Sequence, residues 1–321
     1  MSAPQSPAAE IRLSAEGSEL LARLVFGRKA EAADPAQLRF PLQALAGSAS
    51  ESWFAAGPVE HLAAEPGLQL YRSPDYLFGL LSLPAAQTGN MERATYLAYR
   101  RLLTLAEEQD YPHFLRLWNY FHEVTGGEGD DERYRRFCVG RYDAMAVPGF
   151  ESRLSAATVI GSFVPGFQIG FLAARRPGIP VENPRQVSAY QYPREYSPRA
   201  PSFARATLHQ RLLLVSGTAS VVGHATRHPF DAPAQLRETI ENLQALLAQA
   251  RQQHFAAAPA MHWQPRALRL YVRDAAQAPA LMAQAEALLG GEPLPLAVLH
   301  GEICRRDLEV EIEGVFEAVG A

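Results

Sequence analysis

The sequence predicts an α+β protein in which one folded unit occurs twice. The order strand, strand, helix, strand, helix, strand, strand occurs over residues 67–176 and again over residues 203–316. A Pro-rich segment separates the two occurrences, and 321 residues are enough for two domains that each bury a core. We therefore expect domains at 1–176 and 203–321 with a connector at 177–202, and in each domain a mixed sheet with two helices on one face.

The first unit is predicted to contain five strands and two helices. Its elements are strands at Leu68–Arg72 and Tyr76–Leu83, a helix at Met91–Gln109, a strand at His113–Tyr120, a helix at Asp130–Met145, and strands at Ala156–Phe163 and Phe167–Ala174. The first helix has apolar residues at helical spacing, and the second has acidic residues in its first turn, where the helix dipole favours them. We expect the last two strands to form a closing hairpin.

The second unit repeats this order. Its elements are strands at Phe203–Leu208 and Leu212–Gly217, a helix at Ala232–Gln252, a strand at Leu268–Val272, a helix at Pro279–Leu289, and strands at Leu296–Cys304 and Leu308–Phe316. Asp231 is a suitable N-cap for the long helix, and Pro233 fits its first turn. Because helices cover only one face of each sheet, something else must bury the other face.

Composition excludes several classes of function. The net charge of −4 argues against nucleic acid as a partner, since phosphate binding needs a basic excess or stripe. The first thirteen residues do not resemble a signal peptide, and no apolar run is long enough to span a bilayer, so we expect a soluble cytoplasmic protein without a membrane partner.

The reactive residue types narrow the chemistry further. Cys138 and Cys304 are the only cysteines and lie in different units, which indicates neither a disulfide framework nor a cysteine-rich metal site. Lys29 is the only lysine, so Schiff-base chemistry is disfavoured. The abundant arginines instead suit two-pronged binding of carboxylates, and we expect no cofactor.

Three carboxylates alternate along the last predicted strand. Glu309, Glu311 and Glu313 share one side of it, which for an isolated strand most often means a solvated edge. Cys304 lies just before this strand. A four-residue turn at 305–308 would place Cys304 opposite Glu309 and on the face of Glu311, whereas a three-residue turn would place them on opposite faces.

The connector is rich in aromatic and arginine residues. It has two interpretations: an ordered cover over a polar pocket, or an extended strap packed on the surface. The residues that would form such a cover, at the end of the connector and just after it, are Tyr190, Tyr192, Arg194, Tyr196, Arg199 and Arg205.

Motifs across the second unit resemble the RidA (YjgF) family. They are Leu212–Gly217, Asp231, Ala234–Gln235, Glu241–Leu243, Val272–Asp274 and Val310–Glu313. The first unit looks like a degenerate version of the same ββαβαββ domain. RidA proteins that hydrolyse enamines carry an arginine on the penultimate strand, and here Leu296–Leu299 contains none, which argues against simple RidA activity.

Over nearly its full length the chain resembles the chorismatase family, which joins two RidA-like units. The matching stretches are Phe78–Leu81, Leu117–Phe121, Phe137–Arg141, Val181–Tyr190 and Val215–Ser220. This family removes pyruvate from chorismate, giving a dihydroxycyclohexadiene carboxylate in one branch and hydroxybenzoates in others. The resemblance places the proton donor at Glu311 and the residues that separate the branches at Gly217 and Cys304. A glycine at position 217 together with a cysteine at position 304 looks like the hydroxybenzoate-forming branch. The hydrolytic branch is similar to a chain with alanine at position 217.

The residues suit this chemistry. Chorismate carries two carboxylates and an enol ether, and the candidates for binding it are Arg141, Tyr190, Arg194 and Arg205, although each arginine could equally be a surface charge. A carboxyl group in a dry pocket beside other carboxylates keeps its proton near neutral pH, as the general acid must. On the residues alone, Gly217 could be a simple strand end and Cys304 a small packed hydrophobe.

The sequence therefore predicts a cofactor-independent enzyme that converts chorismate to 3-hydroxybenzoate and pyruvate, with 4-hydroxybenzoate as a possible second product. The alternatives are a RidA-like enamine or imine deaminase and a non-catalytic module that binds a small ligand. RidA proteins are trimers, but a doubled chain could satisfy that assembly internally, so monomer and trimer both stay open.

Overall fold

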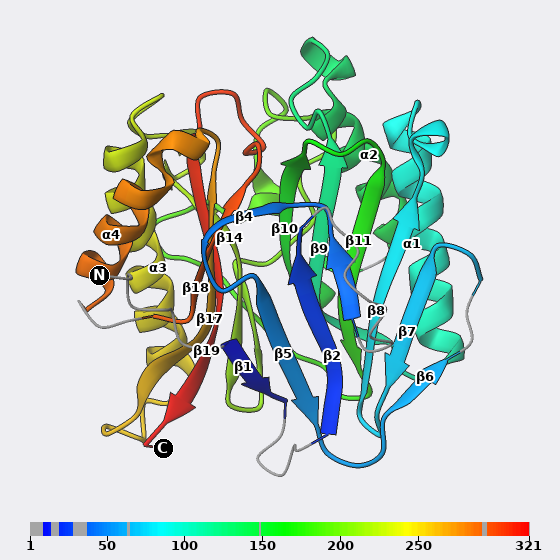
Figure 1. Ribbon diagram of the computed structural model, residues 1–321, viewed down its shortest axis with the longest axis horizontal. Coiled ribbons are helices and arrows are strands. Elements are labelled where there is room, and N and C mark those ends of the chain that lie inside the picture. The colour runs from blue at the N-terminus through cyan, green and yellow to red at the C-terminus, as the bar shows by residue number, and fades with distance from the viewer. Residues whose placement is uncertain are drawn as a thin grey trace.

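The computed structural model describes residues 9–13, 19–27, 37–62, 65–147, 149–290 and 294–320; Lys29 lies outside these ranges. Three sheets and four α-helices make up most of this part of the chain. In Figure 1 the helices lie on the two outer sides of the molecule and the sheets lie between them. No helix in the described ranges is long and apolar enough to cross a membrane.

The six-stranded sheet belongs to the first predicted unit. Its strands, in spatial order, are β10 (Ala156–Ser162), β9 (His113–His122), β11 (Phe167–Ala174), β8 (Tyr76–Leu83), β7 (Leu68–Arg72) and β6 (Glu60–Leu62). The helices α1 (Met91–Glu108) and α2 (Arg133–Met145) pack on one face of this sheet. Asn90 caps α1 by accepting a hydrogen bond from the Arg93 N–H.

The seven-stranded sheet belongs mainly to the second unit. Its strands, in spatial order, are β12 (Ile179–Val181), β13 (Ala206–His209), β14 (Leu212–Ala219), β19 (Val310–Val319), β17 (His262–Val272), β18 (Leu296–His300) and β4 (Gln43–Gly47). The helices α3 (Ala232–His254) and α4 (Ala278–Leu289) cover one face. Asp231 caps α3 as expected, accepting from the Ala234 N–H at 3.0 Å. The edge strand β4 comes from the N-terminal part of the chain.

Both predicted closing hairpins are wrong, for one reason. In the first unit β10 and β11 do not pair with each other, because β10 is parallel to β9 and β11 lies on the other side of β9. In the second unit β18 and β19 are separated in the same way, because β18 is parallel to β17 and β19 lies on the other side of β17. In each unit the chain thus makes a strand–helix–strand crossover before the last strand returns to the sheet centre. Cys304 consequently has no register with Glu309, because β18 ends at His300.

A third sheet, which the sequence did not predict, precedes both units. It consists of β1 (Ala9–Arg12), β5 (Ser50–Ala55), β2 (Glu19–Phe26) and β3 (Gln37–Phe40) in that order, and the short β15 (Val221–Val222) and β16 (Ala225–Thr226) form a separate ribbon. In Figure 1, β1, β2 and β5 lie in front, between the two larger sheets.

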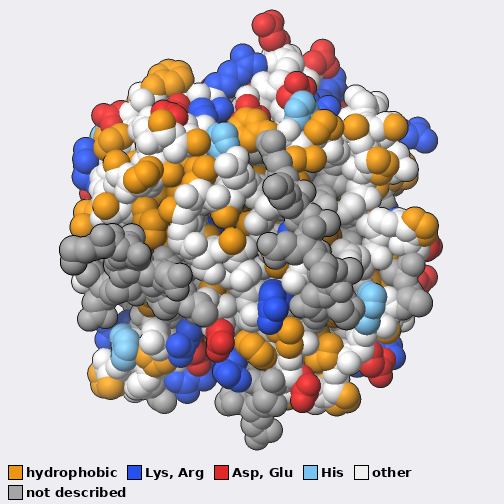
Figure 2. Space-filling view, viewed as in Figure 1, with side chains coloured by type: hydrophobic (Ala, Val, Ile, Leu, Met, Phe, Trp, Pro, Cys, Tyr) orange, Lys and Arg blue, Asp and Glu red, His pale blue; other side chains and the backbone are white. Residues whose placement is uncertain are grey.

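The faces without helices are buried by the other sheets, which confirms that something other than helices covers them. One apolar cluster joins Trp118 of β9, Tyr271 of β17 and Trp53 of β5. Strand β19 is therefore central, and the prediction that its carboxylates mark a solvated edge is wrong for Glu311 and Glu313, which are 4% and 2% exposed. The surface instead mixes both signs of charge with scattered apolar side chains, as Figure 2 shows for one face.

We expect the four-stranded sheet to contribute strongly to stability. Replacing the fully buried Leu24 of β2 with alanine should lower the free energy of unfolding by about 2 to 5 kcal/mol, because it removes apolar contacts and leaves a cavity. The measurement is urea-induced unfolding. The matched control is Leu97→Ala on α1, where the side chain is 52% exposed and the change should stay within about 0.5 kcal/mol. Equal effects of the two substitutions would contradict the packing described here.

Candidate active site

The two larger sheets meet where the edge strand β10 approaches β14. Hydroxyl groups of the second unit accept hydrogen bonds from backbone N–H groups of this edge. Thr207 accepts from Ala156 at 2.7 Å, and Ser216 accepts from Ala157 at 2.9 Å. In the opposite direction, the Gly217 N–H donates to Thr158 Oγ1 at 2.9 Å. These hydrogen bonds pair the backbone N–H groups at the edge of one sheet and hold the beginning of β10 against the second half of β14.

The segment after β18 reaches this seam by its own backbone pairing. Gly161 and Glu302 exchange N–H to carbonyl hydrogen bonds of 2.8 and 3.0 Å. A Cβ at Gly301 would overlap the Ile160 side chain, so this close approach requires glycine there. The bridge to β10 thus brings Cys304 to the seam without the hairpin that the sequence suggested.

A cavity of about 530 Å³ lies along the seam. Its walls come from α2, β10, β14, β19, the connector and the segment that contains Cys304. Five of the seven residues singled out from the sequence line it, namely Arg141, Arg205, Gly217, Cys304 and Glu311. Residues from both units therefore share one cavity.

The other two sequence candidates do not line the cavity. Tyr190 packs against a small cluster around Phe150 and Leu154. Arg194 is 65% exposed and binds both carboxylate oxygens of Asp130, at 3.1 and 2.6 Å. The connector nevertheless forms one wall, since Gln186, Tyr192, Glu195, Tyr196, Pro201 and Ser202 line the cavity.

Glu311 presents its carboxyl group to the cavity from β19. Within the described ranges no side chain forms a hydrogen bond or ion pair with it, and a Cβ at Gly217 would overlap its Oε1 atom. Burial raises the pKa of Glu311 to about 8, with a further increase from the charge of Glu313, against the opposing effects of Arg116 and Arg205. The Glu311 carboxyl is therefore mostly protonated at neutral pH.

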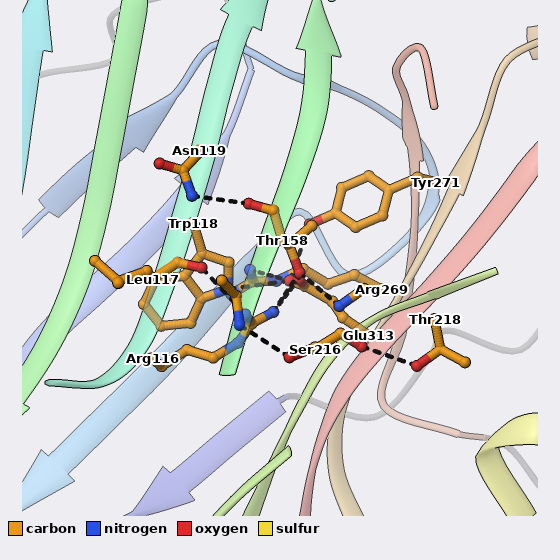
Figure 3. A network of polar contacts seen from close by, with 12 residues as sticks. Arg116, Leu117, Trp118, Asn119, Thr158, Ser216, Thr218, Arg269, Tyr271 and Glu313 are labelled. Carbon is orange, nitrogen blue, oxygen red and sulfur yellow. Dashed lines mark hydrogen bonds and ion pairs between the residues drawn. The ribbon is translucent and has the colours of Figure 1, made fainter. Parts of the chain in front are cut away.

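Glu313, two residues further along β19, is in the opposite state. Five side chains donate hydrogen bonds to its carboxylate, as Figure 3 shows: Arg116, Trp118 (3.1 Å), Thr158, Arg269 (2.5 Å) and Tyr271 (2.9 Å). Burial alone would raise the pKa of Glu313, but Arg116 and Arg269 outweigh it and the pKa is lowered. The strand thus carries a neutral and an ionised carboxyl side by side on one face.

Two buried guanidinium groups have unused donors. Arg141 on α2 is 2% exposed, stacks over the Tyr99 ring at 5.1 Å, and its Nε and Nη2 atoms have no hydrogen-bond partner in the described structure. Arg205 donates to the Val187 carbonyl and to the Tyr192 hydroxyl, both at 2.8 Å, and its Nε is also unpaired. Because buried guanidinium N–H groups without an acceptor are costly, the cavity is suited to an anionic ligand.

The two cysteines of the chain both line this cavity. Burial raises the pKa of each thiol to about 12, and for Cys304 the nearby Glu311 adds to the effect. Both side chains are therefore thiols near neutral pH and not nucleophilic thiolates.

Several lining residues were not identified from the sequence. Tyr134, Phe137 and Cys138 precede Arg141 on the inner face of α2, and Thr158 points in from β10. A signal was present, because Arg141 lies at helical spacing from Phe137 on a stripe that is otherwise apolar and aromatic.

The fold and this cavity define a two-unit α+β protein in which a protonated carboxyl group and two arginines line one cavity. Comparison with known proteins identifies the family to which such a protein belongs. Residues 51–173 match the family model described as chorismatase FkbO/Hyg5-like, N-terminal. The chain is 36% identical over 283 residues to a chorismatase of Streptomyces rapamycinicus, covering 84% of this chain and 82% of that protein.

Two further comparisons agree. A 3-hydroxybenzoate synthase of Streptomyces hygroscopicus is 35% identical over 278 residues, covering 83% of this chain and 81% of that protein. A crystal structure of a chorismatase superposes with a TM-score of 0.76 at 30% identity, covering 92% of each chain. The protein belongs to the chorismatase family, as its sequence motifs indicated.

We expect both cysteines to react slowly in the folded protein, because burial keeps them as thiols. With a disulfide reagent at pH 8, less than about one tenth of the thiols should react within minutes, and both should react after denaturation. Rapid labelling of Cys304 in the native protein, located by peptide mapping, would contradict this expectation.

Proposed function

We propose that this protein converts chorismate to 3-hydroxybenzoate and pyruvate. The observation that carries the proposal is the protonated carboxyl of Glu311 in the same cavity as Arg141 and Arg205, whose buried guanidinium groups have N–H donors without a partner. Relatives that cover more than four fifths of the chain are named chorismatase and 3-hydroxybenzoate synthase. A second product, 4-hydroxybenzoate, remains compatible with the same first step.

Glu311 is the general acid in this mechanism. Its proton goes to the methylene carbon of the enolpyruvyl group, which leaves a positively charged oxocarbenium centre. The ionised Glu313 behind Glu311 and the carboxylate newly formed on Glu311 both stabilise that charge. The bond between the ring carbon and the pyruvyl oxygen then breaks while the oxygen of the adjacent ring hydroxyl bonds to the same carbon and its proton returns to Glu311, so pyruvate leaves and a ring epoxide remains. Glu311 protonates the epoxide oxygen as its bond to the other ring carbon opens, and the carbon that keeps the oxygen then loses its hydrogen as a proton, which gives 3-hydroxybenzoate; opening in the opposite sense gives 4-hydroxybenzoate.

The same carboxyl can complete the cycle. The two products together contain the atoms of chorismate and no others, so the ring must lose one proton for the proton that the methylene carbon gains. After the first step Glu311 is a buried carboxylate beside Glu313, and its raised pKa makes it basic enough to accept a ring proton. No external acid, base or cofactor is then required.

Arg141 and Arg205 hold the two carboxylates of the substrate. Each has at least one buried N–H that no other described group accepts, and a guanidinium binds a carboxylate with two parallel bonds. The roles expected for Tyr190 and Arg194 become indirect, since they hold the connector whose Tyr192 and Tyr196 close the cavity wall.

The direct test is incubation of the purified protein with chorismate, with pyruvate measured by a coupled dehydrogenase and aromatic products by chromatography. Glu311→Gln should lower turnover at least about 100-fold, because the amide cannot donate the proton, while binding of a substrate-like dicarboxylate is kept. Absence of pyruvate above the spontaneous background in the wild type would eliminate the proposal. Ammonia release from an amino-acid-derived enamine, with chorismate unchanged, would favour a deaminase instead.

The pH dependence follows from the state of Glu311. Since the protonated form is the active one and its pKa is about 8, kcat/KM should be constant near pH 6 to 7 and fall about tenfold per unit well above pH 8. A rate that rises through this range would mean that the carboxylate form is the active one.

Gly217 and Cys304 are proposed to select the product. A methyl group at position 217 would occupy the place of Glu311 Oε1, so Gly217→Ala must displace the acid. We expect hydroxybenzoate formation to fall at least about tenfold, with a larger share of the hydrolytic diol, as chromatography would show. Gly89→Ala is the matched control, because no atom lies within 4 Å of its added Cβ. An unchanged product pattern in Gly217→Ala would remove the selecting role.

A further inference from the structure

The Glu313 carboxylate is part of a buried charge cluster that extends away from the cavity. Arg269 of β17 donates to Glu313 through Nη1 at 2.5 Å and to both oxygens of Glu51 through Nε and Nη2, each at 2.5 Å. Arg116 of β9 binds Glu313 from the other side. Glu51 lies on β5, so the cluster connects all three large sheets.

The charges of this cluster balance. It contains two carboxylates and two guanidinium groups, and the ion-paired side chains are 2% to 3% exposed. Neither Arg116, Arg269 nor Glu51 lines the cavity, so none of them can contact the substrate. Burying four charges is costly, and well-packed apolar residues would often be at least as stabilising, so a role beyond stability is worth testing.

We propose that Arg116, Arg269 and Glu51 are positioning residues for the reaction, holding Glu313 ionised and fixed behind Glu311 so that the charge balance of the cluster sets the pH up to which Glu311 keeps its proton. This inference rests on the proposed role of Glu311 as general acid. It makes the N-terminal sheet part of the catalytic apparatus at a distance.

The physical basis is the coupling of two neighbouring carboxyl groups. Glu311 and Glu313 share one face of β19, so they titrate as a pair with two macroscopic pKa values. Removing a cation from the cluster raises both values, and removing an anion lowers both, whichever carboxyl holds the proton. The upper value is the one that the enzyme needs for an acid near neutral pH.

The charged and titratable groups that face Glu311 come from several elements. They are Glu313 on its own strand, Arg116 from β9, Arg205 before β13, Tyr271 opposite it on β17, and Cys304 with Arg305 after β18. Across the cavity lie Arg141 and Cys138 of α2 and Glu132 just before that helix. Of these only Arg116 belongs to the set to be varied, so a shift is attributable to the cluster.

The test compares three variants of the full chain by the alkaline limb of the pH profile of pyruvate formation. Glu51→Gln leaves one net positive charge, so the limb should move to lower pH by about half a unit or more. Arg116→Gln leaves one net negative charge, so the limb should move to higher pH by a similar amount. The variant with both substitutions is balanced again and should have a limb close to that of the wild type.

Glu317→Gln is the matched control. Glu317 lies on the same strand and pairs with Arg266 at 2.7 Å, but belongs to the far end of β19, so its removal should leave the limb in place. A cluster with only a structural role would lower Tm in the variants without opposite shifts of the limb. That result, or shifts of the same sign in Glu51→Gln and Arg116→Gln, would overturn the proposal.

The test gives a result even if a variant does not fold or the wild type forms no pyruvate. If one single variant does not fold, the other and the balanced variant still give a signed comparison. If the wild type forms no pyruvate, the proposed function fails but this inference is still measurable, because the carboxyl stretch of protonated Glu311 can be titrated by infrared spectroscopy and assigned by its loss in Glu311→Gln. Equal infrared midpoints in all variants would then refute it.

Discussion

The structure depends on one ionised carboxylate buried between its sheets. Glu313 receives hydrogen bonds from β9, β10 and β17, and through Arg269 it is tied to β5 as well. An uncompensated charge at this depth would cost several kcal/mol, so each donor has to stay in place while the carboxylate is there. The geometry of the neighbouring cavity is a consequence of that requirement, because β10 and β19 form two of its walls.

The cavity is also a product of the doubled architecture. The first unit supplies Arg141 and Thr158, and the second supplies Glu311, Gly217 and Arg205. A unit folded alone would have only one of these two arginines and only part of the cavity wall. The burial that raises the pKa of Glu311 therefore requires both sheets.

Much of the fold could be predicted because its elements are periodic. The helices at α1 and α3 and the strands β7, β8 and β11 begin and end at or within two residues of the expected positions. Strand pairing was harder, since a strand that follows a crossover has the same alternation as one in a hairpin, and both closing hairpins were expected wrongly. The N-terminal sheet was missed, because its strands lie outside the repeated order.

The candidate site, like the fold, could be predicted only in part. Alternation along β19 correctly placed Glu311 and Glu313 on one side, but no local pattern could show that a second sheet would cover that side. Arg116 lies within a buried strand between Leu115 and Leu117, a signal that its charge is paired with something distant in sequence. The partner, Glu313, is 197 residues away, and only the tertiary structure reveals it.

One strand has a consequence for how such a chain can be divided. Because β4 pairs with β18 along the outer edge of the seven-stranded sheet, the second unit is not self-sufficient in backbone hydrogen bonding. Expressed as a separate polypeptide, it would present the row of donors and acceptors of β18 to solvent and to other copies of itself. Gene fission between the repeats is therefore disfavoured, and any circular permutation has to keep β4 connected to the sheet that it completes.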